Sequence, residues 1–248
     1  MPLLDIALLI LTGLVAGVIN TLAGGGSLLS VPLLVFLGLP GDVANGTNRI
    51  GVLAQNATSM RAFAREGLSG LRDSLGVLAP VVIGSVLGAA AIARLDAAVF
   101  DRVFGVAMLL LLIPTLRGGL AKSGDAPVRA PWPPALRIAV FLAIGVYGGA
   151  IQAGVGLVLL VALQRAGLDL VRANSIKVVV IFALTAVAIP VFILEDQVAW
   201  LPAACLVVGF GLGGRVGVLF AVRGGERVIR PVMAVAVVAM AGRMLGLY

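Results

Sequence analysis

Two glycine-rich segments interrupt long apolar stretches of the sequence, and each could hold a small anion. A glycine break in a helix releases backbone amides and carbonyls, which are tolerated at membrane depth only where protein or water satisfies them. The free amides that start the next half-helix, with the helix dipole, attract negative charge. The spacing therefore predicts an anion site, although close helix packing would explain either cluster taken alone. The residues concerned are Gly24, Gly25, Gly26, Ser27, Gly154 and Gly156.

Polar residues of similar type flank both breaks. An amide side chain, Asn20 or Gln152, lies about one turn before each break. The next apolar segment of each half opens with further candidate ligands, which are Asn45, Thr47, Asn48 and Arg49 in the first half and Asn174, Ser175 and Lys177 in the second. A cationic side chain beside free amides suits an oxyanion, which accepts several charge-assisted hydrogen bonds. Helix capping would also explain the Asn, Ser and Thr residues, and Arg49 could instead extend to the outer interface.

Two other polar positions leave alternatives open. Gln55 and Ser59 share a helical face with Asn48, and such a stripe forms either interhelical hydrogen bonds or a solvated path. Gln55 is included among the candidate ligands. Arg215 lies inside an apolar stretch, where a charge is a functional hypothesis by default. Because the cytoplasmic interface is within its reach, we expect that it is not a direct ligand.

The two breaks belong to corresponding parts of two sequence halves. Allowing a gap of two or three residues, the aligned pairs are Gly13 and Gly145, Gly17 and Gly149, Asn20 and Gln152, Gly26 and Gly156, Gly38 and Gly167, and Asn45 and Asn174. Matching interrupted helices in two halves are the best sequence indication of a transporter's binding site. We therefore expect one repeat over residues 1–117, a cytoplasmic linker over 118–135 and a second repeat over 136–248.

The composition places the chain in a membrane. Of its 248 residues 61% are hydrophobic and only 12% are charged, and its mean hydropathy is +1.16. Soluble domains average about 25% charged residues. The net charge of +7 does not indicate a nucleic-acid partner, because the basic residues lie in short loops between apolar spans, where they set orientation. With one cysteine and no histidine, we expect no metal site, no cofactor and no catalytic residues.

The apolar runs predict an all-α polytopic fold of ten helical segments. A span needs about 20 residues. Eight runs are long enough, namely 4–22, 44–65, 73–93, 97–116, 136–152, 173–194, 198–222 and 227–246. Two shorter runs, 27–37 and 157–165, follow the glycine breaks. Residues 6–22 have no basic cluster before them, and the first basic residue is Arg49, so no cleavable signal peptide is expected.

Loop charges predict the orientation. If the short segments and their flanking loops carry the chain across, thirteen Lys and Arg residues in the loops at 61–72, 117–137, 165–177 and 223–230 face one side, and four face the other. This distribution predicts a cytoplasmic side for those loops, both termini outside and two halves inverted relative to each other. If the short segments are re-entrant instead, each half has four crossings, the halves are parallel, and the loop charges divide far less cleanly between the two sides.

The first break and the motif after it resemble the TauE/SafE sulfite exporter family, also grouped as toluene-sulfonate uptake permeases. The matching residues are Gly13, Gly17, Ala23, Gly24, Gly25, Gly26, Ser27 and Pro32, then Gly38, Leu39 and Pro40, then Ala44, Asn45, Gly46, Thr47 and Asn48. The second half repeats the pattern with Ile176 in place of Thr47 and Val155 in place of a third glycine. The resemblance implies a prokaryotic inner-membrane carrier of sulfite, sulfonates or related sulfur-containing anions.

We therefore predict a secondary transporter, with export favoured, that binds a small anion between the two breaks. No Asp or Glu lies at the centre of a predicted span, so a buried proton relay has no parts. Anion export needs none, because an inside-negative potential of 100 mV supplies about 2.3 kcal/mol per charge. An anion channel on the same scaffold is the alternative. A membrane enzyme would need a cluster of His, Asp or Glu, and a purely structural protein would have no reason to repeat the breaks.

Overall fold

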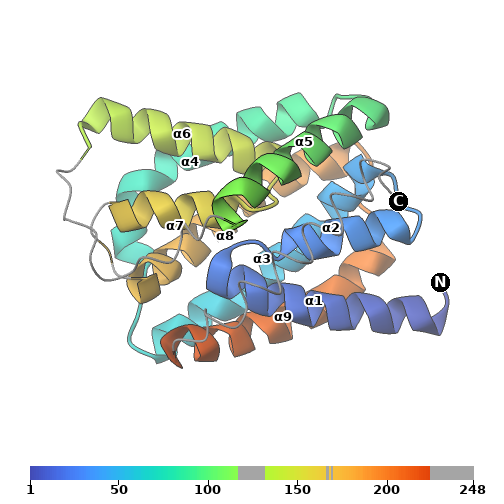
Figure 1. Cartoon of the computed structure of the whole chain (residues 1–248), viewed down its shortest axis with the longest axis horizontal. Helices are drawn as coiled ribbons and strands as arrows, with labels where there is room; N and C mark the ends of the chain where they lie inside the picture. Colours follow the sequence, from blue (N-terminus) through green and yellow to red (C-terminus); the bar gives the residue numbers. More distant parts are fainter. Residues whose placement is uncertain (117–131, 166–167, 169, 224–248) are drawn as a thin grey trace.

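The computed structural model describes residues 1–116, 132–165, 168 and 170–223, and these are helical apart from short connections (Figure 1). The helices are α1 (Leu3–Ala23), α2 (Ser27–Phe36), α3 (Gly41–Arg65), α4 (Leu71–Ile92), α5 (Ala97–Leu116), α6 (Pro134–Ala150), α7 (Val155–Arg165), α8 (Leu170–Leu194) and α9 (Trp200–Arg223). Each begins and ends within three residues of an expected segment. The expected span at 227–246 and most of the expected linker lie outside the described residues.

Four of the described helices, α1, α4, α8 and α9, are long and apolar enough to cross a bilayer. Helix α3 has 25 residues but carries many polar side chains, which lower its hydropathy. Helix α6 has 17 residues and is shorter than a full span. Large apolar side chains are exposed over the outside of the bundle, for example Leu11, Ile83 and Leu212, as expected where lipid rather than water is the solvent.

Both short helices fold back along the helix before them. A Cβ added at Gly26 would meet the carbonyl oxygen of Ala16, ten residues earlier in α1. The Tyr147 hydroxyl donates a hydrogen bond to the carbonyl of Ala153, 2.5 Å away, across the second turn. In Figure 1, α1 runs leftward and α2 returns, whereas α6 runs rightward and α7 returns. Each short helix therefore runs antiparallel to the helix before it, and the two form a hairpin.

The first helix of each hairpin packs on a helix of the other half. Gly13 and Gly17 of α1 lie against α9, and a Cβ at Gly17 would come within 2.8 Å of the Phe210 carbonyl oxygen. Gly145 and Gly149 of α6 lie even closer to the backbone of α4. Small residues allow this approach between helices in lipid, where apolar burial gives no drive to associate. These four glycines are therefore packing positions, distinct from those of the breaks.

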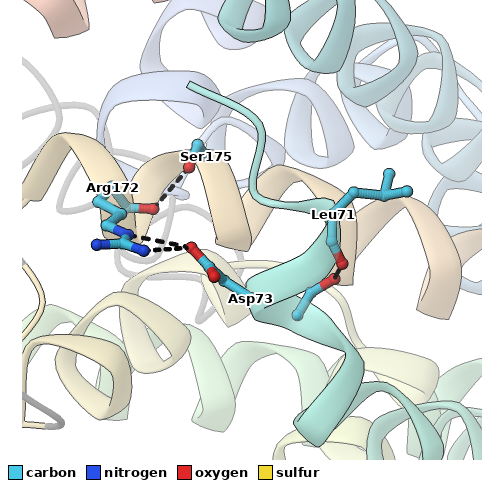
Figure 2. A network of polar contacts seen from close by, with 5 residues as sticks. Leu71, Asp73, Arg172 and Ser175 are labelled. Atoms are coloured by element: carbon cyan, nitrogen blue, oxygen red, sulfur yellow. Dashed lines mark hydrogen bonds and ion pairs between the residues drawn. The ribbon is translucent and has the colours of Figure 1, made fainter. Parts of the chain in front are cut away.

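The first turns of α4 and α8 are joined by an ion pair at one end of the bundle. Figure 2 shows the Arg172 guanidinium against the Asp73 carboxylate, with 3.0 Å between Nη2 and Oδ2. The two side chains are 55% and 36% exposed. Ser175, beside Arg172, donates to the Arg172 carbonyl at 2.8 Å. This end contains loops that the charge count assigns to the cytoplasm.

Asp73→Asn is expected to lower the free energy of unfolding by no more than about 1 kcal/mol, because exposed ion pairs are screened by water and salt. Chemical unfolding of the purified protein at low and high salt would measure the effect. A loss several times larger would show that this pair holds the two halves together.

Candidate anion-binding site

Glycine geometry allows the first break. Helix α1 ends at Ala23, and Gly24 has φ +80°, a left-handed conformation that L-residues with a Cβ rarely adopt. The Gly24 amide bonds back to the Asn20 carbonyl at 2.9 Å. Gly25 and Gly26 then reverse the chain into α2, and all three glycines are buried.

The second break contains a non-glycine residue in the same conformation. After α6 ends at Ala150, Gln152 has φ +61° and Gly154 has φ +72°. A left-handed glutamine costs roughly 1–2 kcal/mol. Its side chain is held by a 2.5 Å hydrogen bond from Nε2 to the Thr185 hydroxyl of α8, and its Oε1 is buried with no hydrogen-bond partner. The strain thus falls on the residue that aligns with Asn20.

The two breaks touch each other. A Cβ added at Gly24 would overlap the backbone of Gly156, and a Cβ added at Gly156 would overlap the Cα of Gly24. Only glycine at both positions allows this approach. The expectation that the interruptions of the two halves meet is therefore confirmed at the level of the backbone.

Several backbone amides of the breaks are left without a protein acceptor. The first amide of the α2 segment that donates a backbone hydrogen bond is that of Leu28, which bonds to the Gly25 carbonyl. In the α7 segment, the first such amides are those of Val155 and Leu157, which bond to the carbonyls of Gln152 and Gly154. Among the residues of the two breaks, five have a backbone amide with no hydrogen-bond acceptor in the described part of the chain, and all five are buried: Gly25, Gly26, Ser27, Gly154 and Gly156. Buried amides without an acceptor are rare in folded proteins. At the starts of two helices they form the arrangement that binds anions.

A polar cluster lies beside the first break. Gln55 accepts a 2.6 Å hydrogen bond from the Asn20 amide and donates to the Thr21 and Ser59 hydroxyls, at 2.7 and 3.0 Å. Asn48 donates to the Ser27 hydroxyl at 2.9 Å and accepts from Ser30 at 2.5 Å. All these side chains are buried. Gln55 and Asn48 of α3 therefore orient the polar groups of the α1–α2 hairpin.

Arg49 of α3 caps the helix that precedes the second break. Its guanidinium donates to the carbonyls of Gly148, Gly149 and Ala150, at 3.1, 2.6 and 2.9 Å, and Asn45 donates to Ala150 at 2.9 Å. The last carbonyls of a helix have no intrahelical donor and carry the negative end of its dipole. Arg49 is 0% exposed and also stacks over the Phe192 ring, so it does not extend to the interface.

Lys177 of α8 caps the helix that precedes the first break. Its ammonium donates to the carbonyls of Asn20 and Thr21, at 3.0 and 2.7 Å, and to the Asn174 side chain at 2.6 Å. The Asn174 amide reaches the Leu22 carbonyl at 3.3 Å. Lys177 is 0% exposed, so it is not a loop charge. Each half therefore supplies the buried cation that caps the interrupted helix of the other half.

Two predicted residues lie away from the breaks, and several unpredicted ones lie beside them. The Thr47 hydroxyl accepts a hydrogen bond from the Ala199 amide, 2.9 Å away before α9. Ser175 bonds only within its own helix turn, and Arg215 is exposed on α9. The sequence reading missed Thr21, Ser30 and Thr185. Thr185 has a signal, because it aligns with Asn56 at the same 129-residue offset that aligns Asn174 with Asn45.

The match to a family model extends over most of the chain. The model of the sulfite exporter TauE/SafE family matches residues 9–244. The chain belongs to the TauE/SafE family. It is a multi-pass membrane protein, and the buried polar centre just described lies within the part that matches.

Three curated relatives have similar length. A probable membrane transporter protein of Haemophilus influenzae is 28% identical over 97% of this chain and 94% of its own length. The probable membrane transporter protein ORF9 of a Sinorhizobium species is 26% identical, over 97% and 92%. The probable membrane transporter protein YfcA of Escherichia coli K12 is 25% identical, over 98% and 90%. No solved structure matches this TauE/SafE chain.

Proposed function

We propose that this protein is a secondary transporter that exports a small sulfur-containing oxyanion, such as sulfite or an organosulfonate. The family description and the names of the relatives support a membrane transporter of this kind. The anion would bind the free amides of both breaks, with Ser27, Asn20 and Gln152 beside it. Five buried amides without an acceptor on two touching helix breaks carry this proposal. The nearby buried guanidinium adds positive potential, since Arg49 has no ion pair with a described carboxylate.

The candidate residues divide into two roles. The proposed direct ligands are the amides of Gly25, Gly26, Gly154 and Gly156 and the polar groups of Ser27, Asn20 and Gln152. We assign a positioning role to the residues that brace the hairpins, which are Asn45, Asn48, Arg49, Gln55, Asn174 and Lys177. This second role follows from their hydrogen bonds, because their donors are directed at carbonyls or neighbouring side chains of the hairpins.

The hairpins also suggest a topology. We propose that α1–α2 and α6–α7 dip into the membrane from opposite sides and that each is followed by three crossings, the last of them at 227–246. The halves are then inverted, and the basic loop residues of the sequence count, apart from the buried Lys177, still share one side. Figure 1 supports this arrangement, because the two hairpins point in opposite directions along the bundle.

The contact between Gly24 and Gly156 favours a carrier over a channel. It leaves no passage between the breaks, so an anion held on one side of the contact needs a conformational change to leave on the other. A carrier of this kind shows saturable flux, whereas a channel on the same scaffold shows flux that rises in proportion to concentration.

Flux measurements in proteoliposomes test the proposal. Radiolabelled sulfite and sulfoacetate are expected to cross vesicles that contain the protein faster than protein-free vesicles, with saturation, and an imposed potential is expected to change the rate. Absence of flux for both anions under either sign of potential would reject the transported class. Linear concentration dependence would replace the carrier by the channel.

A further inference from the structure

A basic pocket lies between α3 and α9, at the end of the bundle where both helices finish. It has a volume of about 280 Å³, and its polar lining consists of Thr58, Arg61, Arg65, Glu66 and Arg215. Three arginines and a single glutamate therefore line one pocket. None of the four charged side chains forms an ion pair within the described part of the chain.

Close packing at Gly214 places the backbone next to Arg215 against α3. A Cβ at the preceding residue, Gly214, would come within 2.6 Å of the Gln55 carbonyl oxygen and of the Thr58 hydroxyl. The backbones of α3 and α9 thus meet beside the pocket, which holds the Cα of Arg215 close to α3. Arg215 also lies eight residues before the end of α9 at Arg223, roughly 12 Å along the axis. Its side chain is exposed, so its guanidinium is accessible to an anion in the pocket.

We propose that this pocket is a second anion site, which binds a tetrahedral oxyanion through Arg61, Arg65 and Arg215. Guanidinium groups bind such groups by paired, charge-assisted hydrogen bonds, and the cavity is large enough for one. The oxyanion is either a free anion of the sulfate type or the phosphate of an anionic lipid, since both present the same oxygens. Glu66 limits the net charge of the four side chains to +2.

The pocket also adjoins the polar cluster at the first break. Thr58, on the pocket wall, donates to the Gln55 carbonyl at 2.9 Å, and the Gln55 side chain bonds to Asn20. Ser59, next along α3, donates to the Gly214 carbonyl at 3.2 Å. If the proposed function holds, the pocket would be an initial binding site from which a free anion passes to the central site. Binding in the pocket does not depend on that function.

Thermal unfolding of the detergent-purified protein tests the site. Sodium sulfate is titrated at constant ionic strength, and palmitoyl-oleoyl-phosphatidylglycerol is titrated against the matching phosphatidylcholine. Arg215→Gln is expected to weaken about tenfold the apparent affinity for the probe that stabilises the wild type, because it removes one charge-assisted contact. Arg223→Gln, on the same helix but outside the pocket, is the matched control and is expected to respond like the wild type. The double variant Arg61→Gln/Arg65→Gln, at the exposed end of α3, serves if Arg215→Gln does not fold.

The outcomes separate the sources of the anion. Protection by sulfate that is lost in the variants supports a free-anion site, and protection by the anionic lipid alone supports a headgroup site. Equal responses of wild type and variants to both probes would overturn the proposal. Failure of sulfite and sulfoacetate flux would reject the proposed function but leave these binding results intact.

Discussion

Gly24→Ala is expected to abolish transport and to lower the melting temperature more than a substitution at any other glycine with positive φ in the described part of the chain. The methyl group would overlap the backbone of Gly156, which cannot move aside like a flexible side chain, and Gly24 also has φ +80°. A left-handed alanine costs roughly 1–2 kcal/mol, and forced overpacking adds roughly 1–3 kcal/mol. The breaks would have to separate, which would remove the proposed site.

Substitutions at two other glycines distinguish the cost of backbone strain from the cost of steric overlap. Gly38 has φ +95° but no heavy atom within 4 Å of an added Cβ, so Gly38→Ala carries the backbone strain alone. Gly156 lacks a positive φ but would overlap Gly24, so Gly156→Ala carries the overlap alone. We expect Gly38→Ala to retain flux with a small loss of stability and Gly156→Ala to lose flux as Gly24→Ala does. Melting temperatures and sulfite flux of the three variants test this. Normal flux in Gly156→Ala would show that contact between the breaks is not required.

The sequence was sufficient to place the helices and both breaks. Apolar runs that end at glycine clusters predict the helix limits to within three residues, because a membrane-spanning helix is a continuous apolar run whose ends are visible in the sequence. The alignment of Asn20 with Gln152 and of Asn45 with Asn174 also brought together residues that lie at the breaks in space. Charge counts, in contrast, depended on which segments cross, and hairpins give the same division of loops as full crossings. The charge count therefore does not distinguish a hairpin that dips into the membrane from two full crossings.

The partners of the buried cations could not be predicted. Arg49 and Lys177 were expected to bind an anion, whereas they bind the carbonyls of helices from the opposite half. Helix periodicity shows which face of α3 or α8 is polar but does not show which helix that face meets. Thr47 shows the same limit, because it lies beside Asn48 in the sequence yet points toward the start of α9. Pairing between halves is a tertiary property that one sequence does not reveal.

The reciprocal capping couples the conformations of the two halves. The amides of a break can receive an anion only if its hairpin holds its shape, and each hairpin is held by a cation from the other half. Movement of α3 relative to α6, or of α8 relative to α1, would release carbonyls that have no other charged donor among the contacts described. A change at one break is thereby coupled to the helix that braces the other.

Arg49→Met is therefore expected to be among the most destabilising single substitutions in the protein. It removes three hydrogen bonds to the carbonyls of Gly148, Gly149 and Ala150 and the contact with Phe192. Leaving buried acceptors unsatisfied costs roughly 1–3 kcal/mol each in mutational studies, so we expect a loss of several kcal/mol, less any relaxation. Arg49→Lys keeps the charge but has a single nitrogen donor, so its free energy of unfolding is expected to lie between those of the wild type and Arg49→Met. Arg94→Met, at an exposed position, is the control for loss of a cation.

Lys177→Met tests the second cap. Together, Arg49→Met and Lys177→Met test whether the two cations brace the hairpins or bind the anion. If both cations brace the hairpins, each variant lowers the melting temperature without sulfite present, and the KM of any remaining transport changes less than its maximal rate. If Arg49 instead binds the anion directly, Arg49→Met keeps the wild-type melting temperature and raises the KM strongly. The double variant distinguishes independent caps from coupled ones, because additive losses of unfolding free energy indicate independence. We expect a smaller loss than the sum, because once one hairpin is released the contact at Gly24 and Gly156 no longer depends on the other cap.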